Sequence, residues 1–276
     1  MRLFAVVLPC LLLATALAEA RPPSRQARQQ LRQTKAKHVA QKRAAIAEPR
    51  PAEPRPIDPY ADADASKPAE AAAPRRDRSQ SIGAPWAGRL QDASRLPSTE
   101  GIHIRRPHRS FGTRTTVEHV RRAIRTTRDA FPKAHTLAIG DLSAERGGWI
   151  SEHASHRSGR DIDLGFFYKK QPTGYPESFV RATGENLDLP ATFSLLANLL
   201  DSHGLDGGVQ VVFLDYDVQG QLYRWGKDNG VPQRILDQIF QYPHGRVATG
   251  LVRHHPNHAD HFHVRFRCAQ SDTSCY

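Results

Sequence analysis

Cysteine is scarce in this chain of 276 residues, which contains only three. Cys10 lies inside the N-terminal apolar stretch, so removal of that stretch would leave Cys268 and Cys275, both near the C-terminus. In an exported protein such a pair most simply forms a disulfide, which would stabilise the fold by about 2–3 kcal/mol; two free thiols are the alternative. The disulfide would exclude cysteine from any metal site.

The sequence also lacks an uninterrupted apolar segment of the roughly 20 residues that a transmembrane helix needs. Residues 1–20, MRLFAVVLPCLLLATALAEA, contain one early arginine, an apolar run broken by Pro9, and a final Ala-Glu-Ala. This pattern is typical of a secretory signal peptide with its cleavage site. It fits less well a permanent membrane anchor or a lipoprotein acylated at Cys10, so we expect the protein to be exported.

Aromatic residues are almost absent from residues 21–80, which are rich in Ala, Pro, Arg and Gln. Such a segment has too little apolar surface to offset the entropy of chain ordering, so we predict a disordered linker. Residues 1–80 hold 15 basic and 8 acidic residues, and therefore seven of the eleven net positive charges. Behind an export signal, this basic linker is expected to contact anionic cell wall or lipid and not nucleic acid; a solvated spacer is the alternative.

Residues 81–276 have the composition of a globular domain, and they are numerous enough for one hydrophobic core. The spacing of apolar residues predicts helices over residues 115–131, 190–203 and 232–241. Strands are predicted over residues 135–142, 160–167, 209–214 and 260–266. Helices and strands without regular alternation predict an α+β fold, a single domain around a mostly antiparallel β-sheet.

The segment HASHRSGRDID, residues 153–163, concentrates histidine and aspartate. If the residues around Ile162 form a strand, Asp161 and Asp163 point to the same face, because side chains alternate along a strand. Ser158 and Gly159 can turn the chain so that His156 approaches Asp163. One imidazole and one carboxylate can therefore meet at one point.

A second cluster, RHHPNHADHFHVRF, lies near the C-terminus and contains His258, His261 and His263. On a strand, His261 and His263 would share a face about 6.6 Å apart. Catalytic zinc takes three nitrogen or oxygen ligands and keeps a fourth position for water. Two histidines and one aspartate from the two clusters predict such a zinc site. Surface histidines, or a weak and adventitious metal site, are the alternatives.

HASHRSGRDIDL and HADHFHVRFRC resemble the two signature segments of the penicillin-insensitive murein endopeptidases. This family belongs to a group of zinc peptidases that also contains lysostaphin-type enzymes, D-Ala-D-Ala peptidases and the hedgehog signalling domain. The resemblance extends through SIGAPWAGRL, RSFG and LAIGDLSAERGGWISEHASH, and covers residues 81–268. It implies that residues 81–276 form a zinc endopeptidase domain in which His156, Asp163 and His263 bind Zn²⁺.

The same resemblance implies a periplasmic zinc metallopeptidase, a murein DD-endopeptidase whose partner is peptidoglycan. The family hydrolyses the D-alanyl to meso-diaminopimelyl cross-link, and some members also accept the diaminopimelyl to diaminopimelyl link. A metal-activated water would attack the peptide carbonyl, His261 would carry a proton to the leaving amine, and His258 would assist or orient it. The alternatives are a catalytically inactive zinc-stabilised peptidoglycan-binding module and a carboxypeptidase acting on free stem peptides. No sequence feature indicates the oligomeric state.

Three further residues have open roles in this interpretation. His153 would line the site or hold a ligand through a hydrogen bond. Asp161 would orient a ligand imidazole, bind the amino group of a diaminopimelyl side chain, or form a salt bridge with Arg157 or Arg160. Asp141, at the end of a predicted strand, belongs either to the site or to an ordinary turn.

The aromatic-rich segment FFYKKQPTGYPESF, residues 166–179, directly follows one of the predicted strands. Because that strand carries the candidate ligand Asp163, the segment is predicted to form a wall or flap of a substrate cleft. A surface loop that packs on itself is the alternative.

Overall fold

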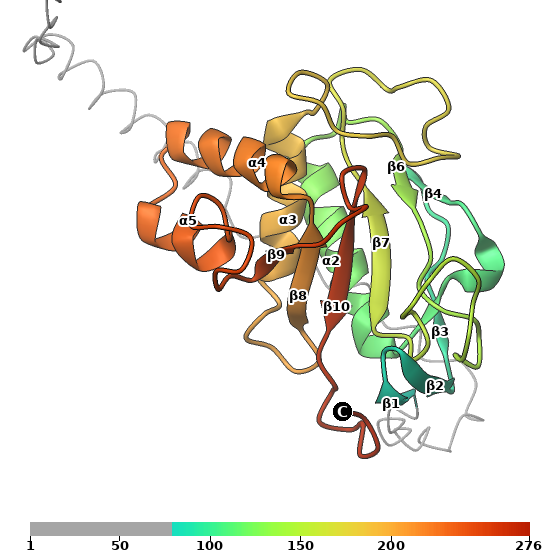
Figure 1. The fold of residues 1–276 in the computed structure, drawn as a ribbon. Coiled ribbons are helices and arrows are strands. Elements are labelled where there is room, and N and C mark those ends of the chain that lie inside the picture. Colours follow the sequence, from blue (N-terminus) through green and yellow to red (C-terminus); the bar gives the residue numbers. More distant parts are fainter. Residues whose placement is uncertain (1–78) are drawn as a thin grey trace, which may run out of the picture. The chain divides into compact units, whose positions relative to one another are not determined.

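The computed structural model describes residues 79–276 (Figure 1). The predicted signal peptide, residues 1–20, lies outside the described residues, and so does nearly all of the predicted linker, residues 21–80. The described part has the α+β fold that the sequence predicts, with helices and strands around one hydrophobic core. Within it, no helix is both long and apolar enough to cross a membrane.

A six-stranded sheet forms the centre of the structure, in the order β4-β6-β7-β10-β8-β9. Its strands are β4 (Ile102–Ile104), β6 (Leu137–Ile139), β7 (Asp161–Gly165), β8 (Val209–Leu214), β9 (Val252–His254) and β10 (His261–Phe266). The inner pairings β6–β7, β7–β10 and β10–β8 are antiparallel, whereas the edge strands β4 and β9 pair in parallel. The sheet is therefore mostly antiparallel, as predicted.

The helices lie behind this sheet and beside its β9 edge (Figure 1). They are α2 (Arg114–Ala130), α3 (Leu189–Leu200), α4 (Tyr216–Asp228) and α5 (Gln233–Ile239). Smaller elements lie before α2 in the sequence: the hairpin of β1 (Gln80–Ala84) and β2 (Ala87–Gln91), the paired strands β3 (Ser94–Arg95) and β5 (Phe111–Gly112), and the short 3₁₀ helix η1 (Pro107–Arg109).

Helix α2 begins slightly earlier than its apolar pattern predicts. The predicted helix starts at residue 115, whereas α2 starts at Arg114 and its N-cap is Thr113, whose hydroxyl accepts a hydrogen bond from the backbone N–H of Thr116 at 3.1 Å. This bond satisfies one of the free N–H groups of the first helical turn. The buried positions Val117 and Val120 follow the predicted helical spacing.

Strands β7 and β10 separate two environments, because their side chains alternate between the two faces of the sheet. The fully buried core residues of these strands are Ile162, Leu164, Phe262, Val264 and Phe266. The alternate positions hold Asp161, Asp163, His261 and His263. The apolar set packs with the helices, so the sheet presents the acidic and imidazole set on its other face.

The C-terminal segment is fastened to the rest of the domain. A disulfide joins Cys268 to Cys275, with Cα atoms 5.8 Å apart, which is the pairing that the sequence suggested. The backbone N–H of Gly83 in β1 donates to the carbonyl of Ser274 at 2.8 Å. Arg160, directly before β7, donates from Nη2 to the carbonyl of Tyr276 at 3.0 Å. The chain end therefore supports the start of the strand that carries Asp161 and Asp163.

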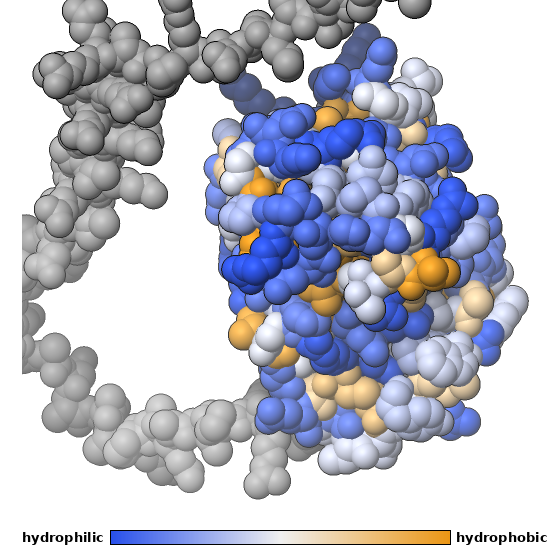
Figure 2. All heavy atoms as spheres, turned by 60° about the vertical axis from the view of Figure 1, so that its left-hand side comes forward, coloured by the Kyte–Doolittle hydropathy of each residue, from blue (hydrophilic) through white to orange (hydrophobic). Residues whose placement is uncertain are grey.

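The surface matches this burial of apolar side chains. In the view of Figure 2, hydrophilic residues predominate on the described part, and hydrophobic residues form small separate patches. Among the large hydrophobic side chains that remain exposed are Trp86 and Trp149, at 58% and 69% of their surface.

Replacing Phe262 by alanine is expected to lower the free energy of unfolding by about 3–5 kcal/mol, because the ring is fully buried and packs edge-on against Phe166 at 4.9 Å between ring centroids. Urea unfolding followed by circular dichroism measures this loss. Val247→Ala is the control, since Val247 is 99% exposed and its removal should change stability by less than about 0.5 kcal/mol. A loss below about 1 kcal/mol for Phe262→Ala would show that this core packing is described wrongly.

Candidate metal centre

The turn before β7 brings His156 back toward the strand. His156 has a left-handed backbone conformation with φ of 63°, and Gly159 follows with φ of 72°. A Cβ atom at Gly159 would lie 2.8 Å from the side chain of Leu90, so only glycine fits this turn without rearrangement. The Asp161 carboxylate accepts a hydrogen bond from the backbone N–H of His156 at 3.0 Å, which fixes the turn from inside.

Three imidazoles surround one oxygen atom of Asp163. Asp163 Oδ1 lies 3.3 Å from His156 Nε2, 3.4 Å from His263 Nδ1 and 3.6 Å from His261 Nε2. The register of the sheet produces this arrangement, since His263 of β10 lies directly opposite Asp163 of β7. The structure therefore brings together His156, Asp163 and His263, the three residues predicted to bind a metal ion.

The atoms at the centre of this group suit a metal ion. His156 Nε2 and Asp163 Oδ1 are buried and have no hydrogen-bond partner, which ordinarily costs about 1–3 kcal/mol for each atom. Zinc bound at 2.0–2.1 Å in tetrahedral geometry keeps its ligand atoms about 3.3 Å apart. The separations of 3.3 and 3.4 Å from Asp163 Oδ1 to the two imidazole nitrogens match that spacing.

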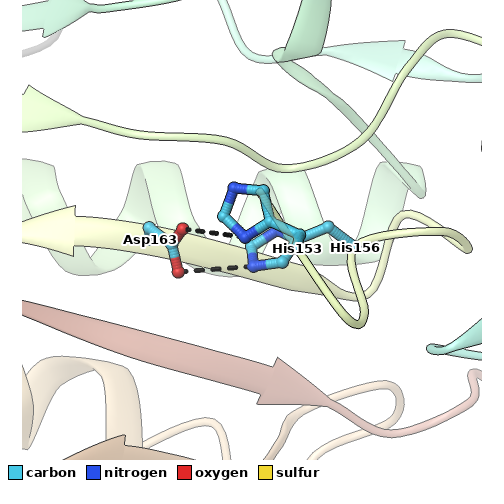
Figure 3. Close-up of side chains that lie close together, drawn as sticks. All are labelled: His153, His156 and Asp163. Carbon is cyan, nitrogen blue, oxygen red and sulfur yellow. Dashed lines mark ion pairs between the residues drawn. The ribbon is translucent and has the colours of Figure 1, made fainter. Parts of the chain in front are cut away.

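A second possible ligand set replaces His263 by His153. In Figure 3, His153 and His156 both point toward Asp163, and one ligand atom from each of the three residues lies within 4.8 Å of the others. His153 Nδ1 is 3.9 Å from Asp163 Oδ2, the oxygen that does not face His156 and His263. The two sets share His156 and Asp163. His153 completes the set whose ligand atoms all lie within 4.8 Å of one another, whereas His263 lies nearer to the Asp163 oxygen that faces His156.

His156 and His153 each have a hydrogen-bond partner at their other nitrogen, whereas His263 Nε2 has only an ion-pair contact. His156 Nδ1 lies 2.8 Å from the carbonyl of Leu142, so it donates there, and Nε2 is the nitrogen that faces Asp163. His153 Nε2 lies 2.9 Å from Asp141 Oδ2, and His263 Nε2 lies 3.4 Å from Asp161 Oδ1. Such partners fix the tautomer and the orientation of metal-binding histidines.

Asp161 is a buried residue that binds neighbouring side chains. Its carboxylate accepts two hydrogen bonds from Arg265, at 2.7 and 3.2 Å, and it is fully buried. Of the three alternatives for Asp161, the salt bridge to Arg157 or Arg160 is wrong, because Arg265 faces Asp161 across the β7–β10 pairing. Complete burial also leaves Asp161 unable to bind an amino group of a substrate. Its position near His263 agrees with the remaining alternative, the orientation of a ligand imidazole.

Asp141 lies beneath the site, two residues after β6. It is fully buried and accepts hydrogen bonds from Arg109 at 3.0 Å and from His153 at 2.9 Å, while Arg106 Nε lies 2.9 Å from its other oxygen. Burial raises the pKa of Asp141, but its bonds to His153 and Arg109 outweigh this effect and lower the pKa below its usual value. Asp141 is therefore ionised, and it holds His153, Arg106 and Arg109 in place. It belongs to the site and is not an ordinary turn residue.

The charge of Asp163 dominates the protonation of its neighbours. Burial lowers the pKa of His156, but the adjacent Asp163 carboxylate overcomes this and raises the pKa to about 9. Burial likewise raises the pKa of Asp163, and the surrounding histidines lower it far below the usual range. In the metal-free protein at neutral pH, Asp163 is therefore ionised, and His156 is protonated on both ring nitrogens and positively charged.

The two histidines predicted to take part in catalysis lie beside this centre. His261 Nδ1 is 2.6 Å from Asp260 Oδ1 and donates to it, and His261 Nε2 lies 3.6 Å from Asp163 Oδ1. The ring of His258 is 4.9 Å from the ring of His261, and its Nδ1 lies 2.7 Å from the carbonyl of Pro256. Burial lowers the pKa of His258 to about 4, so this imidazole is neutral at physiological pH.

The centre opens into a cleft of about 580 Å³. Among the residues that line it are Trp86, Arg105, Phe179, Phe213, His255 and Arg265. The predicted cleft wall, residues 166–179, contributes Phe179 to the lining, whereas Phe166 and Phe167 at its other end are buried in the core. Trp86, Phe213 and Arg105 were not predicted, because each comes from a different part of the chain and none lies in either of the two histidine-rich segments.

Comparison with known proteins gives the same family as the sequence motifs. Residues 81–191 match the family model of penicillin-insensitive murein endopeptidase. The resemblance to this family is confirmed. A protein of Yersinia enterocolitica named penicillin-insensitive murein endopeptidase is 29% identical over 151 residues, 51% of this chain and 48% of its own. A protein of the same name from Pectobacterium atrosepticum is 26% identical over 147 residues, 50% and 47% of the two chains.

The comparisons cover only part of this chain and part of each relative. The chain spans about half the length of the curated relatives it matches. The family model covers His153, His156 and Asp163 but ends at residue 191, so His258, His261 and His263 lie beyond it. The participation of the C-terminal histidines therefore depends on their geometry around Asp163.

Metal binding is expected to release about one proton from the protein at pH 7.5, because the raised pKa of about 9 keeps His156 protonated and a metal ion needs its Nε2 lone pair. The apparent affinity should therefore rise with pH up to about 9. Titration calorimetry in buffers of different ionisation enthalpy counts these protons together with any released by a water ligand of the metal ion, whose pKa zinc lowers to about 7. His258→Ala should release the same number, since the pKa of His258 is already about 4. Binding without proton release would show that the charge coupling between His156 and Asp163 is absent.

Proposed function

We propose that this protein is an exported zinc-dependent endopeptidase that hydrolyses peptide cross-links of peptidoglycan. The observation that carries the proposal is the cluster of buried, unpartnered ligand atoms around Asp163 Oδ1 at the floor of an open cleft. The match to the murein endopeptidase family supports the substrate class. The bonds proposed for cleavage are the D-alanyl to meso-diaminopimelyl link and, as a further substrate, the diaminopimelyl to diaminopimelyl link.

The proposed location follows from the proposed substrate. Peptidoglycan cross-links lie outside the cytoplasmic membrane, so the enzyme would act in the periplasm after removal of a signal peptide at residues 1–20. Residues 21–80 would form a basic linker to a catalytic domain at residues 81–276. In that linker, Lys and Arg are numerous enough to attract anionic cell wall or lipid.

His156, Asp163 and His263 would hold the metal ion. When bound, zinc supplies a Lewis acid that lowers the pKa of a water ligand to about 7 and polarises a peptide carbonyl. Asp161 and the Leu142 carbonyl would keep the two imidazoles oriented. Because Asp163 is already ionised in the metal-free protein, it needs no proton loss before it binds a cation.

His261 is the residue best placed to move protons during hydrolysis. Its Nδ1–H donates to Asp260, which leaves Nε2 as an acceptor directed at the centre. Nε2 would take a proton from the attacking water and deliver it to the leaving amine. Asp260 would stabilise the imidazolium that forms between these two steps. His258 would pack against the ring of His261, and because it is neutral it would add no positive charge near the metal ion.

Alanine substitution of the ligands tests the metal set. His156→Ala, Asp163→Ala and His263→Ala should each lose bound zinc and cleavage of muropeptide dimers, because two remaining ligands do not hold the ion in a catalytic site. His153→Ala should retain the ion, since His153 contacts Asp141 and is further from Asp163. Metal analysis of the purified proteins and chromatography of the digests give the two readouts.

The pair His153→Ala and His263→Ala separates the two possible ligand sets. Loss of zinc from the first variant, with retention in the second, would assign the third ligand to His153. Retained cleavage by Asp163→Ala would end the proposed ligand assignment altogether. Zinc binding by the wild type without cleavage of any dimer would favour the non-hydrolytic binding module, and cleavage of pentapeptide monomers alone would favour the carboxypeptidase.

His261→Ala should lower kcat by about 10²- to 10⁴-fold while the zinc content stays at the wild-type value, because the residue transfers protons and does not bind the ion. Steady-state assays on a defined dimer, with metal analysis of the same samples, measure both quantities. The matched control is His244→Ala, in which a half-exposed histidine that pairs with Asp237 outside the cleft is removed. A fall of less than tenfold in kcat would assign the proton transfer to another group.

A further inference from the structure

One arginine in the cleft has no acidic partner. Arg105, Arg106 and Arg265 all line the cleft. Arg106 pairs with Asp141, and Arg265 pairs with Asp161. Arg105 forms no ion pair with any carboxylate in the part of the chain that the structure describes. It therefore brings an uncompensated positive charge to the cleft wall.

The guanidinium of Arg105 is nevertheless held in a fixed position. Its Nε donates a hydrogen bond to the carbonyl of Glu177 at 2.9 Å, and its Cζ lies 4.4 Å from the centroid of the Phe179 ring. Stacking on an aromatic ring is a common way to orient a guanidinium group. The two terminal nitrogens have no hydrogen-bond partner among residues 79–276, so their fork of N–H groups is free to bind a ligand.

Phe179 connects this cation to the candidate reaction centre. Its ring stacks on the imidazole of His261, with 4.8 Å between ring centroids and an interplanar angle of 14°. Gly140 makes room for this packing, since a Cβ atom there would lie 2.8 Å from both the Asp163 side chain and the Phe179 ring. The stack of Arg105, Phe179 and His261 places the free guanidinium one aromatic ring away from an imidazole that faces Asp163.

We propose that Arg105 forms a carboxylate-binding subsite that selects substrates with a free carboxylate next to the scissile bond. The inference rests on the proposed function and specifies the substrate for the same site. When the amine of an amino acid forms the cross-link, the carboxylate of that amino acid stays two bonds from the scissile nitrogen. A guanidinium fork binds a carboxylate through two parallel hydrogen bonds, so Arg105 would hold the leaving-group side of the cross-link.

Two muropeptide dimers that differ only in this group test the subsite, one with the free carboxylate and one with its amide. The zinc-loaded full chain should cleave the carboxylate dimer with a kcat/KM about 10- to 100-fold higher, the expected effect of one charge-assisted interaction. Arg105→Gln should lose this preference and cleave both dimers at the rate of the amide. Arg105→Lys should keep part of the preference, because it retains the charge and loses the fork.

Arg253→Gln is the matched control. Arg253 also donates its Nε to a backbone carbonyl, that of Gly250 at 3.2 Å, but it is exposed and does not line the cleft. This variant loses the same charge and should keep the wild-type preference. An Arg105→Gln protein that still prefers the carboxylate dimer by the wild-type factor would overturn the proposal.

Binding measurements separate the subsite from the hydrolytic function. The single-stem products of the two dimers, carboxylate and amide, are titrated into the zinc-loaded full chain by calorimetry. If the wild type cleaves neither dimer but binds the carboxylate product more tightly, and Arg105→Gln abolishes that difference, the subsite stands and the proposed hydrolysis fails. If the wild type cleaves both dimers equally and binds both products equally, the hydrolysis stands and the subsite fails.

Discussion

The antiparallel register of β7 and β10 is the constraint on which the candidate site depends. It sets His263 opposite Asp163 and Arg265 opposite Asp161. The same strand pairing therefore brings two candidate metal ligands together and gives the buried Asp161 carboxylate its arginine partner. Because side chains alternate along a strand, a shift of one residue would turn Asp163 into the core and Ile162 toward the cleft. The apolar residues of these strands thus fix the positions of the ligand atoms as well as the core.

Three buried carboxylates lie under the cleft, and they differ in how their charge is balanced. A buried carboxylate is costly unless a cation or several hydrogen bonds compensate it. Asp141 faces Arg106 and Arg109, and Asp161 faces Arg265. Within residues 79–276, the Asp163 carboxylate forms ion pairs only with histidines, whose charge depends on protonation. In the metal-free protein a proton on His156 balances Asp163, and a divalent cation at the same place would replace that proton.

The features that the sequence could predict are those with a local pattern. The apolar run at residues 209–214 is strand β8 with the predicted bounds, and the turn residues before β7 do bring His156 to Asp163. Helix α4 was not predicted, because Gly220 and Gly226 interrupt its apolar pattern. The partner of Asp161 is 104 residues away in the sequence, and only the strand register identifies it. Such cross-strand contacts depend on the tertiary structure, so no short segment encodes them.

A crystal structure of the zinc-loaded protein, with anomalous scattering measured at the zinc absorption edge, tests the central claim most directly. We predict one strong anomalous peak at bonding distance, about 2.0–2.2 Å, from His156 Nε2, Asp163 Oδ1 and His263 Nδ1. A peak bound elsewhere in the protein, or one that lacks either His156 or Asp163 as a ligand, would contradict the metal centre described above.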